Sequence, residues 1–70
     1  MASKEFYQKT YPKGTRVEII DLCNPEPFYP AGTRGTVKYV DDALQIHVTW
    51  DNGGSIALLP EEGDIFKIIS

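Results

Sequence analysis

The chain has 70 residues, of which 41% are hydrophobic and 24% are charged, and its formal net charge at pH 7 is -3. This length allows only one small core, and the ordinary composition excludes a disordered chain. No apolar run approaches the roughly 20 residues that cross a bilayer, no secretory leader pattern is present, and Cys23 is the single cysteine, so we expect a cytoplasmic protein without a membrane partner.

The charge is unevenly distributed along the chain. Residues 1–16 hold four cations and one acid, whereas residues 17–70 hold three cations and nine acids. Binding to a nucleic-acid backbone depends on clustered Lys and Arg side chains. The acidic body of the chain therefore argues against nucleic acid as a partner.

The first twelve residues predict a short helical or irregular extension. Ser3 is a suitable N-cap, Tyr7 and Tyr11 would share one face of a helix, and Pro12 would end it. We therefore divide the chain into an extension, residues 1–12, and a domain, residues 13–70.

Five short runs of β-branched and aromatic residues follow, over residues 15–21, 35–40, 45–50, 55–59 and 64–69. Three prolines make a semi-rigid loop of residues 22–32 between the first two runs. Residues 51–54, Asp-Asn-Gly-Gly, predict a tight hairpin, and residues 60–64 predict a 3₁₀ turn before the last strand. This order predicts an all-β fold, a small five-stranded SH3-like barrel.

Period-two alternation along the strands predicts which side chains form the core. Apolar residues left over from this pattern, among them Ile20 and Ile65, exceed what one inner face needs. They indicate contacts at the barrel ends, under the extension, or with a partner. The predicted core residues are Val17, Ile19, Val37, Tyr39, Ile46, Val48, Trp50, Ile56, Leu58, Phe66 and Ile68.

For every candidate catalytic or metal-binding group in the sequence, a purely structural role is the simpler interpretation. Cys23 lies in the proline loop and His47 in the middle of a strand, so nothing brings a nucleophile and a base together. The acids around the turns lack calcium-loop spacing, and Gly32 and Gly35 precede a strand rather than a helix, which argues against a phosphate loop. We predict a protein that is not an enzyme and has no cofactor and no metal.

Aromatic and polar residues in the loops are the candidates for binding a ligand or partner. Phe28 and Tyr29 either form a recognition platform in the proline loop or fold back over an open barrel end. Trp50 either plugs the core or stands with nearby polar groups as a ligand site. The predicted contact residues are Arg16, Phe28, Tyr29, Arg34, Trp50, Asp51 and Asn52.

Three motifs carry a resemblance when they are read together: YPKGTRV at residues 11–17, GTRGTV at 32–37, and VDD through IHV to WDNG at 40–53. In this order and spacing the chain resembles the domain of unknown function 4314 family, small domains of bacteria, their phages and other mobile elements. The resemblance covers residues 11–69 and implies an SH3-like barrel in a mobile-element setting, without an activity. More distantly, the GTV and WDNG pattern is similar to SH3-like modules that bind proteins.

Two functional hypotheses follow. The first is a non-enzymatic binding module that meets another protein, or its own copies, through the proline loop, the Trp50 hairpin and the surplus apolar residues. The alternative is a phage anti-defence protein that sequesters a small nucleotide-type signal. In that case Trp50 or Tyr29 would stack on a base and Arg16 or Arg34 would meet phosphate. A barrel of this size has little room inside, so the alternative requires a homo-oligomer.

Overall fold

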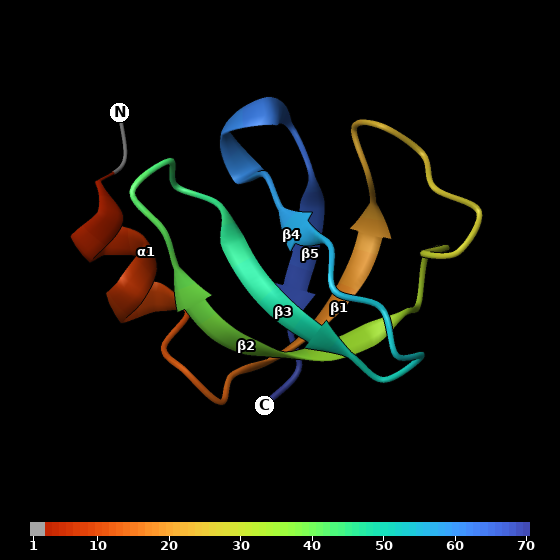
Figure 1. Ribbon diagram of the computed structural model, residues 1–70, viewed down its shortest axis with the longest axis horizontal. Coiled ribbons are helices and arrows are strands. Elements are labelled where there is room, and N and C mark those ends of the chain that lie inside the picture. The colour runs from red at the N-terminus through yellow and green to blue at the C-terminus, as the bar shows by residue number, and fades with distance from the viewer. Residues whose placement is uncertain (1–2) are drawn as a thin grey trace.

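The computed structural model describes residues 3–70 and contains one antiparallel sheet of five strands with one short α-helix (Figure 1). The strand order in the sheet is β4-β3-β2-β1-β5. In chain order the elements are α1 (Lys4–Thr10), β1 (Arg16–Asp21), β2 (Arg34–Val40), β3 (Ile46–Trp50), β4 (Ala57–Leu58), the 3₁₀ helix η1 (Pro60–Glu62) and β5 (Ile65–Ile68).

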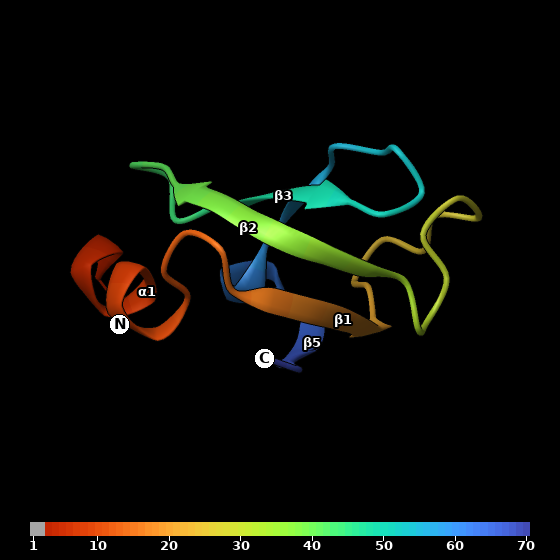
Figure 2. The same ribbon diagram turned by 90° about the horizontal axis from the view of Figure 1, so that it is seen from below.

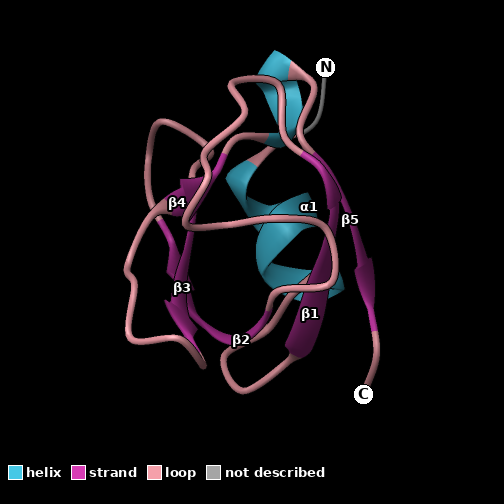
Figure 3. Cartoon of the chain, turned by 90° about the vertical axis from the view of Figure 1, so that its right-hand side faces the viewer, coloured by secondary structure: helices cyan, strands magenta, loops and turns pink. Residues whose placement is uncertain are grey.

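These elements confirm the predicted mostly β chain, its five strands and its short N-terminal helix. The sheet curves strongly from β4 through β2 to β5, as Figure 3 shows from one end. Among the described residues β4 pairs only with β3, and β5 pairs only with β1. The two end strands do not pair with each other, so the sheet is open rather than closed.

Helix α1 covers one end of the curved sheet, beside the end of β2 and the segment that leads into β1 (Figure 2). The hydroxyl of Ser3 accepts a hydrogen bond from the Phe6 N–H at 3.2 Å, which is the predicted N-cap. Tyr7 is buried, and its hydroxyl donates to Glu61 Oε2 at 2.8 Å. The helix is therefore docked on the sheet. No helix within residues 3–70 is long and apolar enough to cross a membrane.

The core lies on the concave side of the sheet and agrees with most of the predicted alternation. Ile56 and Phe66 are partly buried and pack against it. The fully buried side chains are Val17, Ile19, Val37, Ile46, Val48, Trp50 and Leu58.

Tyr39 and Ile68 were predicted in the core, and both predictions are wrong, because these residues are 54% and 48% exposed. In β2, Val37 pairs with Val48 but Tyr39 pairs with His47, so Lys38 is an extra residue, a β-bulge. The bulge reverses the alternation: Tyr39 faces outward and Val40 becomes buried. Ile68 lies opposite Val17 on β5, an end strand of the sheet, so no other strand formed by residues 3–70 covers it.

Candidate functional site

Two loops that are far apart in the sequence pack together at the end of the molecule opposite α1 (Figure 1). They are the proline loop, which was predicted over residues 22–32 and extends over residues 22–33 in the structure, and the hairpin loop, residues 51–56. Asn52 Nδ2 donates a hydrogen bond to the Phe28 carbonyl oxygen at 2.8 Å. The rings of Tyr29 and Trp50 meet edge to face, with their centroids 6.1 Å apart. The structure thus brings four of the predicted contact residues together.

Three aromatic residues of this region have different environments. Trp50 is only 2% exposed, and its indole N–H donates to the Ile56 carbonyl oxygen at 2.9 Å. Tyr29 is also buried, and its hydroxyl accepts the Ser55 N–H at 3.2 Å. Phe28, by contrast, is 58% exposed. Of the alternatives left by the sequence, Trp50 therefore plugs the core, Tyr29 folds back, and Phe28 is presented to solvent.

Gly54 allows the two loops to approach this closely. A Cβ atom at this position would overlap the ring and hydroxyl of Tyr29. The backbone at Gly54 has no positive φ, so the requirement for glycine is one of space and not of conformation. The close approach lets Tyr29 fill the gap beside Trp50.

Replacing Gly54 with alanine should destabilise the protein by about 1–3 kcal/mol, because the added methyl group must displace a packed ring. Thermal denaturation would measure this cost. In a Tyr29→Leu background the obstructing ring is absent, and the same replacement should be nearly neutral. A cost that is equally large in that background would contradict the assignment of Tyr29 as the obstacle.

Arg16 and Asp51 form a two-pronged ion pair on the outer surface of the sheet. Arg16 Nη1 lies 2.8 Å from Asp51 Oδ1 and Nη2 lies 2.6 Å from Oδ2, while Nη1 also donates to Thr36 Oγ1 at 3.0 Å. This hydrogen bonding lowers the pKa of Asp51 and raises that of Arg16. The pair attaches the start of the hairpin loop to β1 and β2.

Arg34 takes part in a second charged cluster on the same outer surface. Its Nε donates to Glu18 Oε1 at 2.9 Å, and Lys67 Nζ lies 3.6 Å from Glu18 Oε2. The hydrogen bond from Arg34 is the main reason that the pKa of Glu18 is lowered. Both predicted arginines thus have carboxylate partners within the chain.

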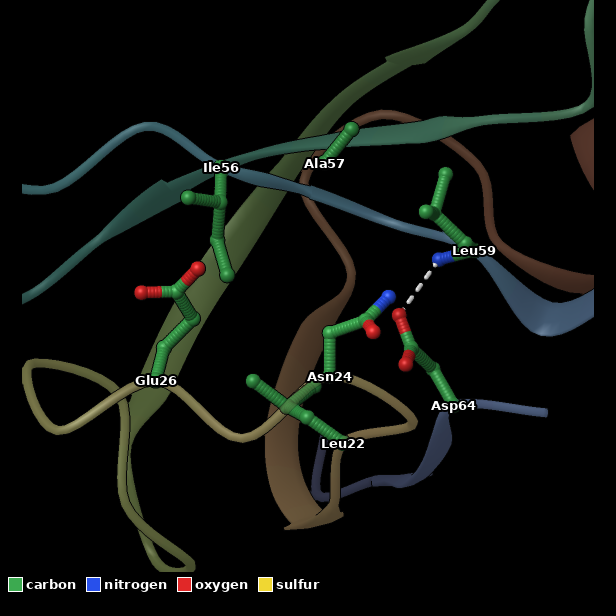
Figure 4. Close-up of a pocket in the computed structure, with 7 residues that line it drawn as sticks. All are labelled: Leu22, Asn24, Glu26, Ile56, Ala57, Leu59 and Asp64. Atoms are coloured by element: carbon green, nitrogen blue, oxygen red, sulfur yellow. Dashed lines mark hydrogen bonds between the residues drawn. The ribbon is translucent and has the colours of Figure 1, made fainter. Parts of the chain in front are cut away.

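A hollow lies in front of β4, between the proline loop and residues 56–59, and we call it the β4 hollow. Figure 4 shows its two walls: one comes from the proline loop, and the other comes from β4 and its neighbours. Its volume is about 170 Å³. Its lining residues are Leu22, Asn24, Glu26, Ile56, Ala57, Leu59 and Asp64.

Asp64 holds the two walls of the β4 hollow together. Its Oδ1 accepts the backbone N–H of Cys23 at 2.8 Å, and its Oδ2 accepts that of Leu59 at 2.8 Å. Cys23 follows β1, Leu59 follows β4 and Asp64 itself directly precedes β5, so one carboxylate connects the β4 end of the open sheet to its β1–β5 end. Asp64 was predicted only as the junction between a turn and the last strand, because nothing local indicates contacts 41 residues away.

A third cluster, which was not predicted because it depends on the bulge, lies on the outer surface at the bulge of β2. The rings of Tyr39 and His47 are stacked, with centroids 4.3 Å apart and an interplanar angle of 11°. His47 Nε2 lies 2.8 Å from Asp41 Oδ2, and this contact is the main reason that the pKa of Asp41 is lowered. Within the part of the chain that the structure describes, no group of three or more His, Cys, Asp or Glu could hold a metal ion.

The fold and these sites define a small, mostly β module with one open antiparallel sheet, a docked N-terminal helix and shallow surface hollows. The chain belongs to the family described as "Domain of unknown function (DUF4314)", whose model matches residues 3–69. The match begins within the predicted extension, which agrees with the packing of α1 against β2 and its hydrogen bond to η1. Neither the search of curated proteins nor that of solved structures found a match.

Proposed function

We propose that the chain is a non-enzymatic module with an SH3-like barrel that binds an extended segment of a partner protein in the β4 hollow. The strand order and the strong curvature of the sheet support the barrel (Figure 3). The link through Asp64, which joins the backbone after β1 to the backbone after β4, adds to this support.

The observation that carries the proposal is the position of the hollow along an end strand of the sheet. Among the described residues β4 pairs only with β3, through Ile46 and His47. An end strand presents backbone groups with which an extended peptide can pair, and neighbouring pockets then select its side chains. Leu22, Ile56 and Leu59 give the hollow apolar walls for one such side chain.

The charges around the hollow favour a basic partner. Glu26 and Asp64 are the charged residues among its lining, and both are acidic. Both oxygens of Asp64 already accept backbone hydrogen bonds. The carboxylate of Glu26 makes no hydrogen bond or ion pair with other groups of residues 3–70, so it is available to a Lys or Arg of the partner. The ligand is therefore an apolar side chain next to a basic one.

The proline loop is held in place before any partner arrives, which lowers the entropic cost of binding. Its attachments are the Asn52 amide on Phe28 and the packing of Tyr29 against Trp50. The exposed ring of Phe28 lies on the same loop as Glu26 and offers a further apolar contact. Aromatic residues, phenylalanine among them, are enriched at protein–protein interfaces.

Selection from a displayed library of random peptides should enrich sequences with an apolar residue next to Lys or Arg. A selected peptide should shift the backbone amide resonances of Leu22, Ala57 and Leu59. The Glu26→Lys variant should lose roughly tenfold or more in affinity, because it turns an attraction into a repulsion.

Glu5→Lys is the matched control. Glu5 is exposed on α1, and its replacement by lysine changes the net charge by the same amount. It should leave the affinity unchanged. The proposal would be overturned by a library that yields no binder, or by equal losses in the two variants. Protection of Ala57 and Leu59 by a dimer of the chain would also overturn it, because a second copy would then occupy the hollow.

A further inference from the structure

A second hollow lies near α1, and its chemistry differs from that of the β4 hollow. It is bounded by the last turn of α1, the turn after it and the second half of β2, and its volume is about 240 Å³. Two backbone hydrogen bonds of 2.9 Å hold this turn against β2. The Gly14 N–H donates to the Val37 oxygen, and the Val37 N–H donates to the Thr15 oxygen. Its lining residues are Gln8, Tyr11, Pro12, Lys13, Lys38, Tyr39 and Val40, and we call it the tyrosine-lysine hollow.

The charge of this hollow is positive, in a chain whose net charge is -3. Lys13 and Lys38 line it, and no acid does. Neither lysine forms an ion pair with any group of residues 3–70, whereas Lys4, Arg16, Arg34 and Lys67 all do. Two lysines without an internal ion-pair partner among the described residues therefore border the same small space, which favours an anionic ligand.

The aromatic walls favour a planar ring beside that anion. The bulge at Lys38 turns Tyr39 outward, and His47 stacks on one face of its ring. Tyr39 is 54% exposed, and its exposed surface therefore consists of the other face and the edges of the ring. Tyr11 is fixed by packing against Phe66, with ring centroids 5.1 Å apart. In the described part of the chain the hydroxyls of Tyr11 and Tyr39 have no hydrogen-bond partner, so both can bind polar groups of a ligand.

We propose that the tyrosine-lysine hollow binds a nucleoside monophosphate, with its base against Tyr39 and its phosphate near Lys13 and Lys38. A base has a flat face that stacks on an aromatic side chain, and phosphate accepts charge-assisted hydrogen bonds from ammonium groups. The volume of about 240 Å³ is below that of drug-sized pockets, so a single ring enters while the sugar stays near solvent. The site shares no lining residue with the β4 hollow and does not depend on the peptide proposal.

The site is tested by titrating the ¹⁵N-labelled full chain with adenosine monophosphate and following its amide resonances. Saturable shifts are expected at Lys13, Lys38 and Tyr39. Adenosine, which lacks the phosphate, and inorganic phosphate, which lacks the ring, should each bind more weakly at the same residues. Shifts of equal size and affinity with inorganic phosphate alone would contradict a role for the tyrosine ring.

Two double variants with the same net charge separate this hollow from general electrostatic attraction. The double variant K13Q/K38Q should bind adenosine monophosphate roughly tenfold more weakly, a loss of about 1.4 kcal/mol. K4Q/K67Q, whose lysines pair with carboxylates elsewhere, should bind as the unaltered chain does. Equal losses in both would overturn the proposal, as would the absence of shifts in the hollow at millimolar nucleotide. Binding of a single-stranded oligonucleotide without binding of the mononucleotide would overturn it as well.

Discussion

Replacing Trp50 with alanine should destabilise the protein by about 3–5 kcal/mol and leave much of the population unfolded at room temperature. The indole is the largest fully buried side chain, and it joins the core to the hairpin loop through its hydrogen bond to the Ile56 oxygen. Its ring also supports Tyr29 and lies close to Gly35, where a Cβ atom would come within 2.7 Å of it. Urea denaturation followed by circular dichroism would measure the loss.

The Trp50→Phe variant is the control for the two contributions of this side chain. Phenylalanine keeps most of the apolar contact but cannot donate to the Ile56 oxygen, so a smaller loss of about 1–3 kcal/mol is expected. If Trp50→Ala remains as stable as the unaltered chain, the indole does not fill the core. A folded Trp50→Ala protein that only loses ligand affinity would instead support the predicted role of Trp50 in a binding site.

Local patterns in the sequence predict most of the fold, because strands, caps and tight turns depend on neighbouring residues. Ser3 indicates the start of α1, and the Asp-Asn-Gly-Gly run indicates the end of β3. The bulge at Lys38 could not be predicted, since β2 alternates regularly in the sequence and the extra residue is evident only from the pairing with β3. Tyr39 was therefore assigned to the wrong face of the sheet.

The candidate sites were harder to predict because each depends on contacts between distant segments. The prolines predicted a loop between β1 and β2, but residue type could not tell that Tyr29 would be buried while its neighbour Phe28 is exposed. The arginines were predicted as ligand contacts, and only the structure reveals that Arg16 lies on Asp51, 35 residues away. Lys13 and Lys38 are likewise identified as lysines without a carboxylate partner within residues 3–70 only once the ion pairs of Lys4 and Lys67 are known from the structure.

Replacing Asp64 with alanine should cost about 2–4 kcal/mol, because two backbone N–H groups would lose a charged acceptor at once. In a 70-residue domain each kcal/mol lowers the melting temperature by roughly 4–8 °C, so a large shift is expected. Hydrogen exchange should also accelerate at the amides of Cys23 and Leu59, which Asp64 holds. Asp42→Ala removes an equal charge from an exposed side chain and should change neither measurement.

The variant Asp64→Asn distinguishes the acceptor role of Asp64 from its charge. Asparagine keeps one acceptor oxygen, so one of the two N–H groups stays bonded. The free energy of unfolding of Asp64→Asn should therefore lie between that of the unaltered chain and that of Asp64→Ala. Peptide binding in the β4 hollow should weaken in the same order, because the two walls are joined through this side chain. A stable Asp64→Ala protein with slow exchange at Cys23 and Leu59 would mean that other contacts close the open side of the sheet.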